Sequence, residues 1–362
     1  MGWAQTIPAS CDPGSDVANL SLLGYDPLVY HTGRAPLEAV SLGIRLQAED
    51  VAFRCNLVCL DHGPDEKVSM NSYSAGHITT EEARDLIEDL NGHLGKDGLS
   101  FYPGVSYRHI LVWTGADPTV KTLPPHDLTG RDVTAYVYSQ GPLAPIGDLI
   151  RKSWPLLNGH PVNQARKERG LLPANSIWLW GQGRTPVMPD FKERFGLQGG
   201  MISAVDLLKG IGMAAGLEPL DVEGITGYLD TNYRGKADKA LAFLEDNDVV
   251  YIHIEAPDEA SHEGSLEKKI RALEDIDREV VGPVLAGLEK FENYSLMVVT
   301  DHFTPIQVMT HTREPVPFVV LRSQNRQSGA RKRGFSERAG VDGEFSFPKG
   351  DLLMSWFLEI QS

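Results

Sequence analysis

The feature that most constrains the fold is a regular alternation of short apolar runs and helical patterns from about residue 176 onward. The apolar runs of strand length cover residues 176–180, 249–255, 295–300 and 317–321. Between them, helical patterns cover residues 203–215, 236–244 and 266–288. The last of these carries apolar side chains at the 3.6-residue spacing of one helix face, at Ile270, Leu273, Ile276, Val280 and Val281. Such alternation predicts an α/β fold with a mainly parallel sheet covered by helices.

The middle of the chain follows a different pattern. Strand-like runs at residues 51–60 and 101–113, with a helical pattern near 81–94 between them, predict a smaller α+β unit. Glycine and proline mark loops on either side, at Gly33 and at residues 170–173. We therefore expect an inserted domain over residues 43–172, and a discontinuous domain formed by residues 1–42 and 173–362.

Composition and charge exclude several classes of protein. The 362 residues are 41% hydrophobic, which is enough for two domains with cores. The sequence has no apolar run of about 18 residues, so neither a transmembrane helix nor a membrane partner is expected. The formal net charge is −15 without a long basic stripe, so nucleic acid is not an expected partner. The N-terminus does not have the pattern of a signal peptide. Three scattered cysteines, Cys11, Cys55 and Cys59, predict free thiols in a reducing, cytoplasmic compartment.

Potential metal ligands follow two of the predicted strands. Asp258 and His262 come after the run at 249–255, Asp301 and His302 follow the run at 295–300, and His311 lies in the next loop. The carboxyl ends of neighbouring parallel strands meet at one crevice, so these side chains are expected to converge. Mixed oxygen and nitrogen donors suit Mn²⁺, Zn²⁺ or Mg²⁺, and the absence of thiolates argues against a structural zinc site. Each residue alone could be a solvated cap at a strand end, but the five together predict a metal-dependent enzyme.

A serine near the N-terminus is a candidate nucleophile. Ser15 follows Gly14 and enters a short apolar helical pattern. At a helix N-terminus, backbone N–H groups and the helix dipole favour a phosphate group and a serine alkoxide. The alternative is that Ser15 is an ordinary N-cap residue, which is a frequent role of serine at such positions.

Stretches distributed over nearly the whole chain resemble the archaeal-type, cofactor-independent phosphoglycerate mutases of the alkaline phosphatase superfamily. They are residues 14–27, 32–38, 50–57, 106–109, 124–127, 173–181, 227–232, 253–264, 300–302 and 311–318. The resemblance implies an alkaline-phosphatase-like, metal-binding domain interrupted by a smaller substrate-binding domain. It also implies an isomerase of glycolysis and gluconeogenesis that interconverts 3-phosphoglycerate and 2-phosphoglycerate without 2,3-bisphosphoglycerate.

The resemblance further implies a phosphoserine intermediate at Ser15 and two divalent metal ions. One ion would be bound by Asp258, His262 and His311, and the other by Asp301, His302 and Ser15. The substrate is a small phosphorylated hydroxy acid, whose anionic groups call for arginine and histidine contacts. Candidates for these contacts are Arg54, Arg108, His126, Asp127, Arg166 and Lys236; each could instead be a surface or structural ion-pair residue.

Three alternatives remain open from the sequence. The same metal and serine machinery could serve a phosphatase or a homoserine kinase-like enzyme, and the chain could be a non-catalytic paralogue. The last alternative arises because the resembling family begins with a strand whose aspartate binds the second metal, whereas Asp12 is the one acidic residue before Ser15 here. If this first strand is lacking, we expect unpaired strand edges, an apolar groove and weaker binding of the second ion.

Overall fold

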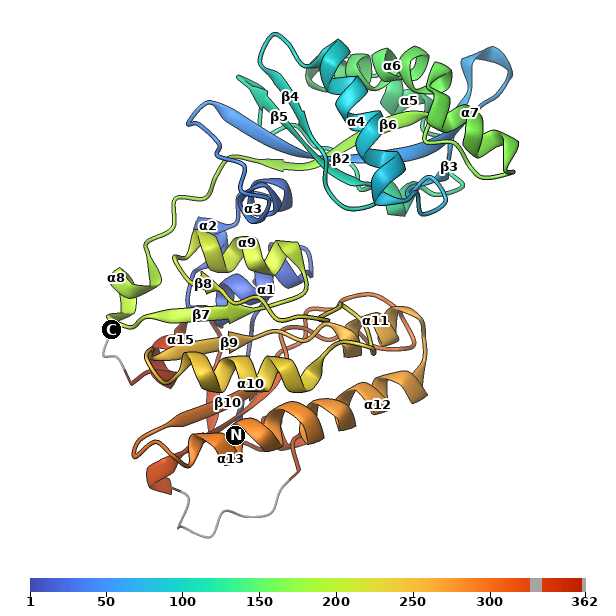
Figure 1. Ribbon diagram of the computed structural model, residues 1–362. Helices are drawn as coiled ribbons and strands as arrows, with labels where there is room; N and C mark the ends of the chain where they lie inside the picture. Colours follow the sequence, from blue (N-terminus) through green and yellow to red (C-terminus); the bar gives the residue numbers. More distant parts are fainter. Residues whose placement is uncertain (326–333, 360–362) are drawn as a thin grey trace. The chain divides into compact units, whose positions relative to one another are not determined.

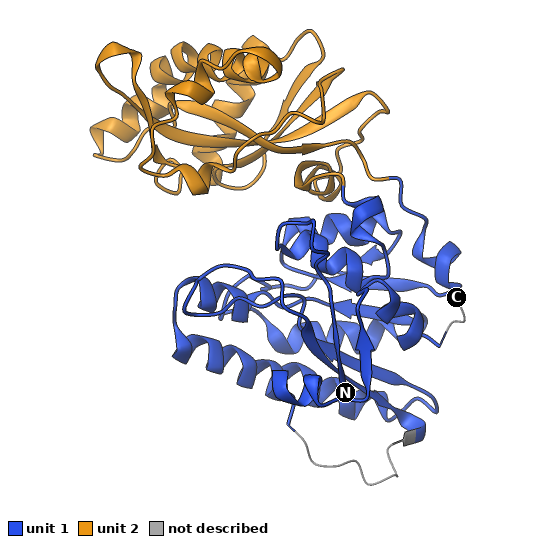
Figure 2. Ribbon diagram, turned by 180° about the vertical axis from the view of Figure 1, so that it is seen from behind, with its two compact units in different colours: residues 1–31, 187–362 blue, residues 32–186 orange. Residues whose placement is uncertain are grey.

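The computed structural model describes residues 1–325 and 334–359, and the chain divides into two compact units. The first unit comprises residues 1–31 and 187–362, and the second unit comprises residues 32–186 (Figure 2). The expected boundaries at 43 and 172 thus fall inside the second unit. The reason is that β6 (Ser176–Gly183) pairs with β2 (Asp50–His62), and α3 (Arg34–Ser41) packs against both strands.

The second unit is built on one antiparallel sheet of five strands. Its order is β3 (Val68–Ser72), β2, β5 (Arg108–Thr114) and β4 (Leu99–Tyr102), with β6 on β2 as well. The strand predicted over 101–113 is in fact the antiparallel pair β4 and β5, because the chain turns between them. Packed on this sheet or linking its strands are α4 (Thr80–Leu94), the 3-10 turn η2 (Pro125–Leu128), α5 (Thr134–Val137), α6 (Ala144–Gly159) and α7 (Pro161–Glu168) (Figure 1).

The first unit contains two separate sheets among the described residues. Three strands, β8 (Glu218–Pro219), β7 (Gly199–Ile202) and β9 (Val249–Ile252), form a sheet that is parallel throughout. The other sheet has the order β10 (Ser295–Val299), β11 (Val316–Arg322), β1 (Gly2–Ala4) and β12 (Phe345–Phe347). In it, β11 runs antiparallel to β10 and β1, and β1 runs parallel to β12. The fold is therefore mixed α/β; where a mainly parallel sheet is expected, the described residues of the first unit form one parallel sheet and one mixed sheet.

The helices of the first unit follow the predicted pattern closely. The helix predicted over 266–288 is formed by α12 (Leu266–Ile276), a π-helical turn over Asp277–Val281 and α13 (Gly282–Leu288). The other two predicted helices are α9 (Asp206–Ala214) and α10 (Tyr233–Phe243). Shorter helices are α1 (Ser15–Leu22), α2 (Pro27–Tyr30), α8 (Phe191–Phe195), α11 (Ala256–His262), α14 (Glu337–Val341) and α15 (Leu352–Phe357). Across residues 1–325 and 334–359, no helix has the length and apolar character needed to cross a membrane.

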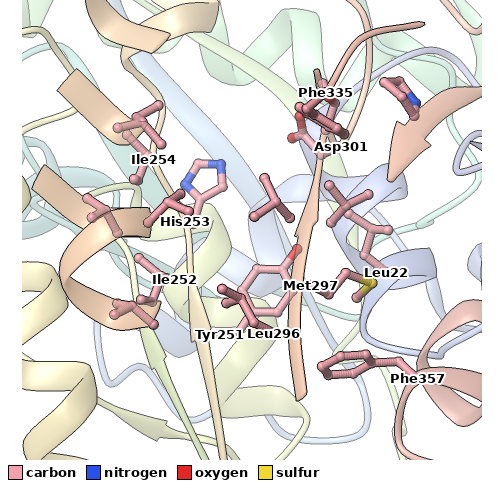
Figure 3. Close-up of a pocket in the computed structure, with 18 of the residues that line it drawn as sticks. Leu22, Tyr251, Ile252, His253, Ile254, Leu296, Met297, Asp301, Phe335 and Phe357 are labelled. Atoms are coloured by element: carbon pink, nitrogen blue, oxygen red, sulfur yellow. The ribbon is translucent and has the colours of Figure 1, made fainter. Parts of the chain in front are cut away.

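An apolar groove separates the two sheets of the first unit. Among the described residues, β9 pairs only with β7 and β10 pairs only with β11, so each strand has one unpaired edge. A groove of about 1330 Å³ lies between these edges, lined by β9, β10 and part of α12. Figure 3 shows Tyr251 of β9 and Leu296 of β10 close together in the pocket, with Ile252 and Met297 farther out among its lining residues. The expectation of an apolar groove beside unpaired strand edges is confirmed.

The groove also explains one departure from the predicted burial and the exposure of two leucines. The run at 249–255 is expected to be a buried strand, but all four residues of β9 are only half-buried because one edge has no neighbour. On α12, Leu273 of the apolar stripe is 52% exposed, and Leu266 at the start of the helix is 61% exposed. Both side chains line the groove.

Candidate metal centre and cationic cluster

Three of the predicted ligands meet around the carboxylate of Asp258. This residue lies in the first turn of α11, directly after β9, and one helical turn places His262 on the same face. The Asp258 Oδ2 atom is 3.1 Å from His262 Nε2, and its Oδ1 atom is 3.3 Å from His311 Nε2. The two Nε2 atoms of His262 and His311 are themselves 3.0 Å apart. A loop residue and a helix residue thus converge as the sequence predicts.

The residues after β10 complete the same site. The rings of His302 and His311 have centroids 4.0 Å apart, and ligand atoms of Asp258, His302 and His311 all lie within 4.8 Å of one another. Thr304 connects them, because its hydroxyl donates to Asp258 Oδ1 and is 3.3 Å from His302 Nδ1. Asp301 Oδ2 is 3.5 Å from His302 Nε2.

This donor set fits a divalent metal ion. Three imidazoles and the carboxylate of Asp258 present mixed nitrogen and oxygen donors at short range, as Zn²⁺ or Mn²⁺ requires. The Nδ1 atom of His262 is 2.9 Å from the Met309 carbonyl oxygen, to which it donates, so a neutral ring directs the lone pair of Nε2 toward His311. The close approach of two Nε2 atoms is favourable only if a cation or a proton lies between them.

The electrostatics of the cluster favour an ionised carboxylate. Burial opposes ionisation of Asp258, but hydrogen bonds from His262 and His311 outweigh it and hold its pKa well below the usual range. The hydrogen bond to Asp258 in turn raises the pKa of His262 to about 9. Burial lowers the pKa of His302, which lies deeper in the site. Asp258 is therefore ionised at neutral pH, and the proton that His262 then holds balances its negative charge.

Ser15 lies at the N-terminus of α1 and faces this centre. The N-cap position belongs to Gly14, whose extended backbone makes no side-chain cap. The Oγ atom of Ser15 is instead 2.9 Å from His302 Nε2. The alternative that Ser15 serves as an N-cap is therefore wrong, and its hydroxyl is available to the metal centre.

Sequence reasoning missed Asn19, which connects the centre to the rest of the first unit. Its amide nitrogen donates to the Ser15 carbonyl oxygen at 2.8 Å and to Asp301 Oδ2 at 3.0 Å. Its side-chain oxygen accepts a hydrogen bond from the Tyr251 hydroxyl at 2.6 Å. Asn19 is one turn after Ser15, inside the first stretch that carries the family resemblance, and this position is the signal that could have found it.

Lys236 lies beside the metal centre rather than in the second unit. Its side chain is 1% exposed, and Nζ donates to the His253 carbonyl oxygen at 2.9 Å. Burial lowers the pKa of Lys236 to about 8, although Glu255 opposes the shift. His253 Nε2 in turn is 3.2 Å from Glu255 Oε2. Lys236 therefore supports the strand end from which Asp258 follows.

The second unit gathers a separate cationic cluster, which consists of Arg34, Arg54, Arg108, His126, Glu38 and Trp180. Arg54 is 7% exposed, and its Nε atom is 3.0 Å from Glu38 Oε2. The Arg54 guanidinium lies 4.4 Å from the centroid of the Trp180 ring, which is also 5.5 Å from the His126 ring. Burial lowers the pKa of Arg54 to about 10, and the nearby Arg34 and Arg108 contribute to this shift. Three of the predicted substrate contacts are thus brought together.

The two remaining candidates of the second unit are less suited to bind substrate. Arg166 is 2% exposed and already donates to the Leu172 and Ala75 carbonyl oxygens at 2.9 and 2.7 Å, with an ion pair to Glu82. These contacts favour the structural ion-pair interpretation of Arg166. Asp127 is exposed, with a carboxylate 3.7 Å from His126 Nε2.

Comparison with known proteins shows which family the chain resembles over its length. The sequence model of the family described as 2,3-bisphosphoglycerate-independent phosphoglycerate mutase matches residues 1–163. A probable 2,3-bisphosphoglycerate-independent phosphoglycerate mutase of Geobacter sulfurreducens is 48% identical over 359 residues, which are 99% of this chain and 90% of that protein. A 2,3-bisphosphoglycerate-independent phosphoglycerate mutase of Methanosarcina barkeri is 49% identical, over 98% of this chain and 88% of that protein.

Solved structures show the same likeness. A structure of a protein from Pyrococcus horikoshii superposes with a TM-score of 0.79 at 26% identity, over 100% of this chain and 87% of that chain. The cofactor-independent phosphoglycerate mutase from Thermoplasma acidophilum has a TM-score of 0.59 at 24% identity, which supports the fold. With near-complete coverage at almost half identity, the chain belongs to the family of 2,3-bisphosphoglycerate-independent phosphoglycerate mutases.

Proposed function

We propose that this chain interconverts 3-phosphoglycerate and 2-phosphoglycerate without 2,3-bisphosphoglycerate. The observation that carries the proposal is the Ser15 hydroxyl, which lies 2.9 Å from His302 Nε2 at a helix N-terminus, beside a cluster of metal-type ligands. A serine in this position can accept a phosphoryl group and return it.

The proposed phosphoryl transfer proceeds in two steps. Ser15 Oγ forms a bond to phosphorus while the bond from phosphorus to the substrate's C3 oxygen breaks, and the proton lost by Ser15 is balanced by the proton that this oxygen gains as the C3 hydroxyl. The C2 hydroxyl of the retained glycerate then attacks the phosphoserine, the bond from phosphorus to Ser15 Oγ breaks, and the proton lost by the C2 hydroxyl is balanced by the one that Ser15 regains. The N–H groups at the start of α1 stabilise the phosphoryl oxygens, and His302 Nε2, 2.9 Å from Ser15 Oγ, keeps the serine hydroxyl beside the metal-type ligands.

Two divalent ions, Mn²⁺, Mg²⁺ or Zn²⁺, fit this scheme. Asp258, His262 and His311 would hold one, and Asp301, His302 and Ser15 would hold the other. Bound ions would neutralise phosphoryl charge and lower the pKa of the serine hydroxyl. Support comes from the short distances within each set, although His302 also lies within reach of the first set.

The cationic cluster is the proposed binding site for the anionic groups of glycerate. Arg54, Arg108 and His126 bear donors that suit carboxylate and phosphate oxygens, and Asp127 lies at their edge. The second unit is then the substrate-binding domain inserted into the metal-binding domain. The free thiols of Cys11, Cys55 and Cys59 suit the proposed reducing, cytoplasmic location. The role in glycolysis rests on the proposed reaction alone.

The unpaired edges of β9 and β10 provide a place where an additional strand could pair. Metal-site residues follow the C-terminal ends of both β9 and β10, so these strands run in the same direction. One added strand between their unpaired edges would join both sheets into a single, mainly parallel sheet. A carboxylate at the C-terminal end of that strand would reach the Asp301 side of the metal centre.

An enolase-coupled assay tests the activity directly. With 3-phosphoglycerate and Mn²⁺ but no 2,3-bisphosphoglycerate, the protein should produce 2-phosphoglycerate, and Ser15→Ala should abolish turnover. Ser261→Ala is the matched control, because Ser261 is buried in the same unit but donates to the Pro257 carbonyl oxygen at 2.6 Å. Near wild-type turnover in Ser15→Ala would remove the proposal. Release of inorganic phosphate without 2-phosphoglycerate would instead identify a phosphatase.

A further inference from the structure

The cationic cluster has more positive charge than its own residues neutralise. Arg34 and Arg108 both lie close enough to Arg54 to lower its pKa, and Glu38 is the carboxylate that opposes them. The three arginines of the cluster carry three positive charges, whereas Glu38 and the exposed Asp127 carry two negative charges. With His126 neutral, one positive charge is left over. The buried guanidinium of Arg54, with two other guanidinium groups close by, needs either a bound anion or a strong local anchor.

Two arginine N–H donors without hydrogen-bond partners also favour a bound anion. The Nε atoms of Arg34 and Arg54 are both buried and have no hydrogen-bond partner among the described residues. Arg54 Nε lies 3.0 Å from Glu38 Oε2 as an ion pair, but not with hydrogen-bond geometry. Unsatisfied, buried donors on two neighbouring arginines are characteristic of a receptor for oxygen anions.

The anchor is the indole of Trp180. Its ring centroid is 4.4 Å from the Arg54 guanidinium carbon and 5.9 Å from that of Arg34, both within the range of cation–π attraction. The indole itself is fixed, because its Nε1 donates to Asn56 Oδ1 at 3.0 Å and the ring is 5% exposed.

The residue after Trp180 borders both arginine stems. Gly181 has φ +61°, and a Cβ atom there would be in ordinary van der Waals contact with Arg54 Cδ at 3.7 Å and with Arg34 Cβ at 3.8 Å. In the sheet, Arg54 lies directly opposite Trp180 across the β2–β6 pair.

We propose that Trp180, held by Asn56, is a positioning residue that keeps Arg34 and Arg54 together as a receptor for an oxyanion. The identity of this oxyanion as a group of phosphoglycerate rests on the proposed function, whereas the receptor itself does not. The attraction of both guanidinium groups to one indole offsets their mutual repulsion. It also orders their N–H donors before the anion binds. This preorganisation is expected to strengthen binding rather than to change the chemical step.

Graded fluorination of Trp180 tests the proposal without disturbing the packing. Mono-, di- and trifluorinated tryptophan at position 180 would progressively remove electron density from the ring while nearly keeping its shape. We expect the Kd for inorganic phosphate, measured calorimetrically on the metal-free protein, to rise stepwise by about tenfold over the series. Glycerate and 3-phosphoglycerate, titrated separately, show whether the carboxylate or the phosphate occupies the receptor.

Two substitutions complete the experiment. Trp180→Phe keeps an aromatic face and should retain most of the affinity, whereas Trp180→Leu should lose it. In turnover, the loss should appear in KM with kcat nearly unchanged. Tyr138→Leu is the control, because Tyr138 forms a cation–π contact of 5.0 Å with Arg151 in the same unit. A Kd that stays within twofold across the fluorinated series, or an equal loss in Tyr138→Leu, would overturn the proposal. Normal phosphate binding without mutase activity would overturn only the proposed function.

Discussion

Asn19 offers the most direct test of the metal centre, because it is not a proposed ligand but holds one in place. Its side chain is fully buried and makes three hydrogen bonds, to Ser15, Asp301 and Tyr251. Two neutral bonds contribute about 1 kcal/mol each and the bond to the carboxylate about 2 kcal/mol. Asn19→Ala should therefore lower the free energy of unfolding by about 4 kcal/mol. It should also weaken binding of the ion at Asp301 by about 10- to 100-fold, as loss of such supporting partners does.

Asn163 provides a matched control in the second unit. It is equally buried, donates to the Leu157 and Ala174 carbonyl oxygens at 2.8 Å each, and accepts from the Ala174 amide at 2.8 Å. Its three neutral bonds predict a loss of about 3 kcal/mol in Asn163→Ala. Guanidinium unfolding measures both stabilities, and titration calorimetry with Mn²⁺ measures both affinities. The reasoning is refuted if Mn²⁺ binds Asn19→Ala as tightly as wild type, or if Asn163→Ala weakens Mn²⁺ to the same degree.

Two further predictions concern acid stability and metal binding. Burial, with a smaller contribution from Arg108, lowers the pKa of His109 to about 3 in the folded state, from 6.5 in the unfolded chain. The unfolded state therefore binds the proton first, so the stability present above pH 6.5 falls as the pH drops toward 3. Wild type should lose about 3 kcal/mol more than His109→Gln between pH 7 and pH 4.5; equal losses in guanidinium titrations would contradict the assignment. For metal, calorimetry should resolve one tighter ion at Asp258, His262 and His311 and one weaker ion at Asp301, His302 and Ser15, because a neutral hydroxyl is a poorer ligand than imidazole. Two equally tight sites would show that another group completes the second set.

Local patterns in the sequence predict much of the metal centre. Asp258 and His262 are one helical turn apart, and Asp301 and His302 directly follow an apolar strand, so their convergence needs only two neighbouring strands with the same direction. The 3.6-residue spacing of apolar side chains likewise predicts a helix over residues 266–288, and this segment forms a nearly continuous helix. Such features depend on residues a few positions apart, and short-range spacing is visible in one sequence.

Partners distant in the sequence are decided by the tertiary structure. The strand at 176–180 is expected in the metal-binding domain, but β6 pairs with β2 in the second unit, because its fully apolar face completes that core. The run at 101–113 forms two strands because the chain reverses after Tyr102, where the Pro103-Gly104 dipeptide marks a turn in the sequence; which strands then pair is decided by packing. The half-buried state of β9 likewise depends on which strands lie beside it.

The supporting residues of both sites show the same division. Sequence motifs identify Ser15, Arg54 and the metal-type ligands by their chemistry. Asn19 and Trp180 are ordinary residues for a helix and a strand, and their importance arises from contacts with Asp301 and Arg54, 282 and 126 positions away. The sequence alone identifies the residues that can bind metal or anions. The hydrogen bonds and ring contacts that hold these side chains in place form only after distant segments have packed together.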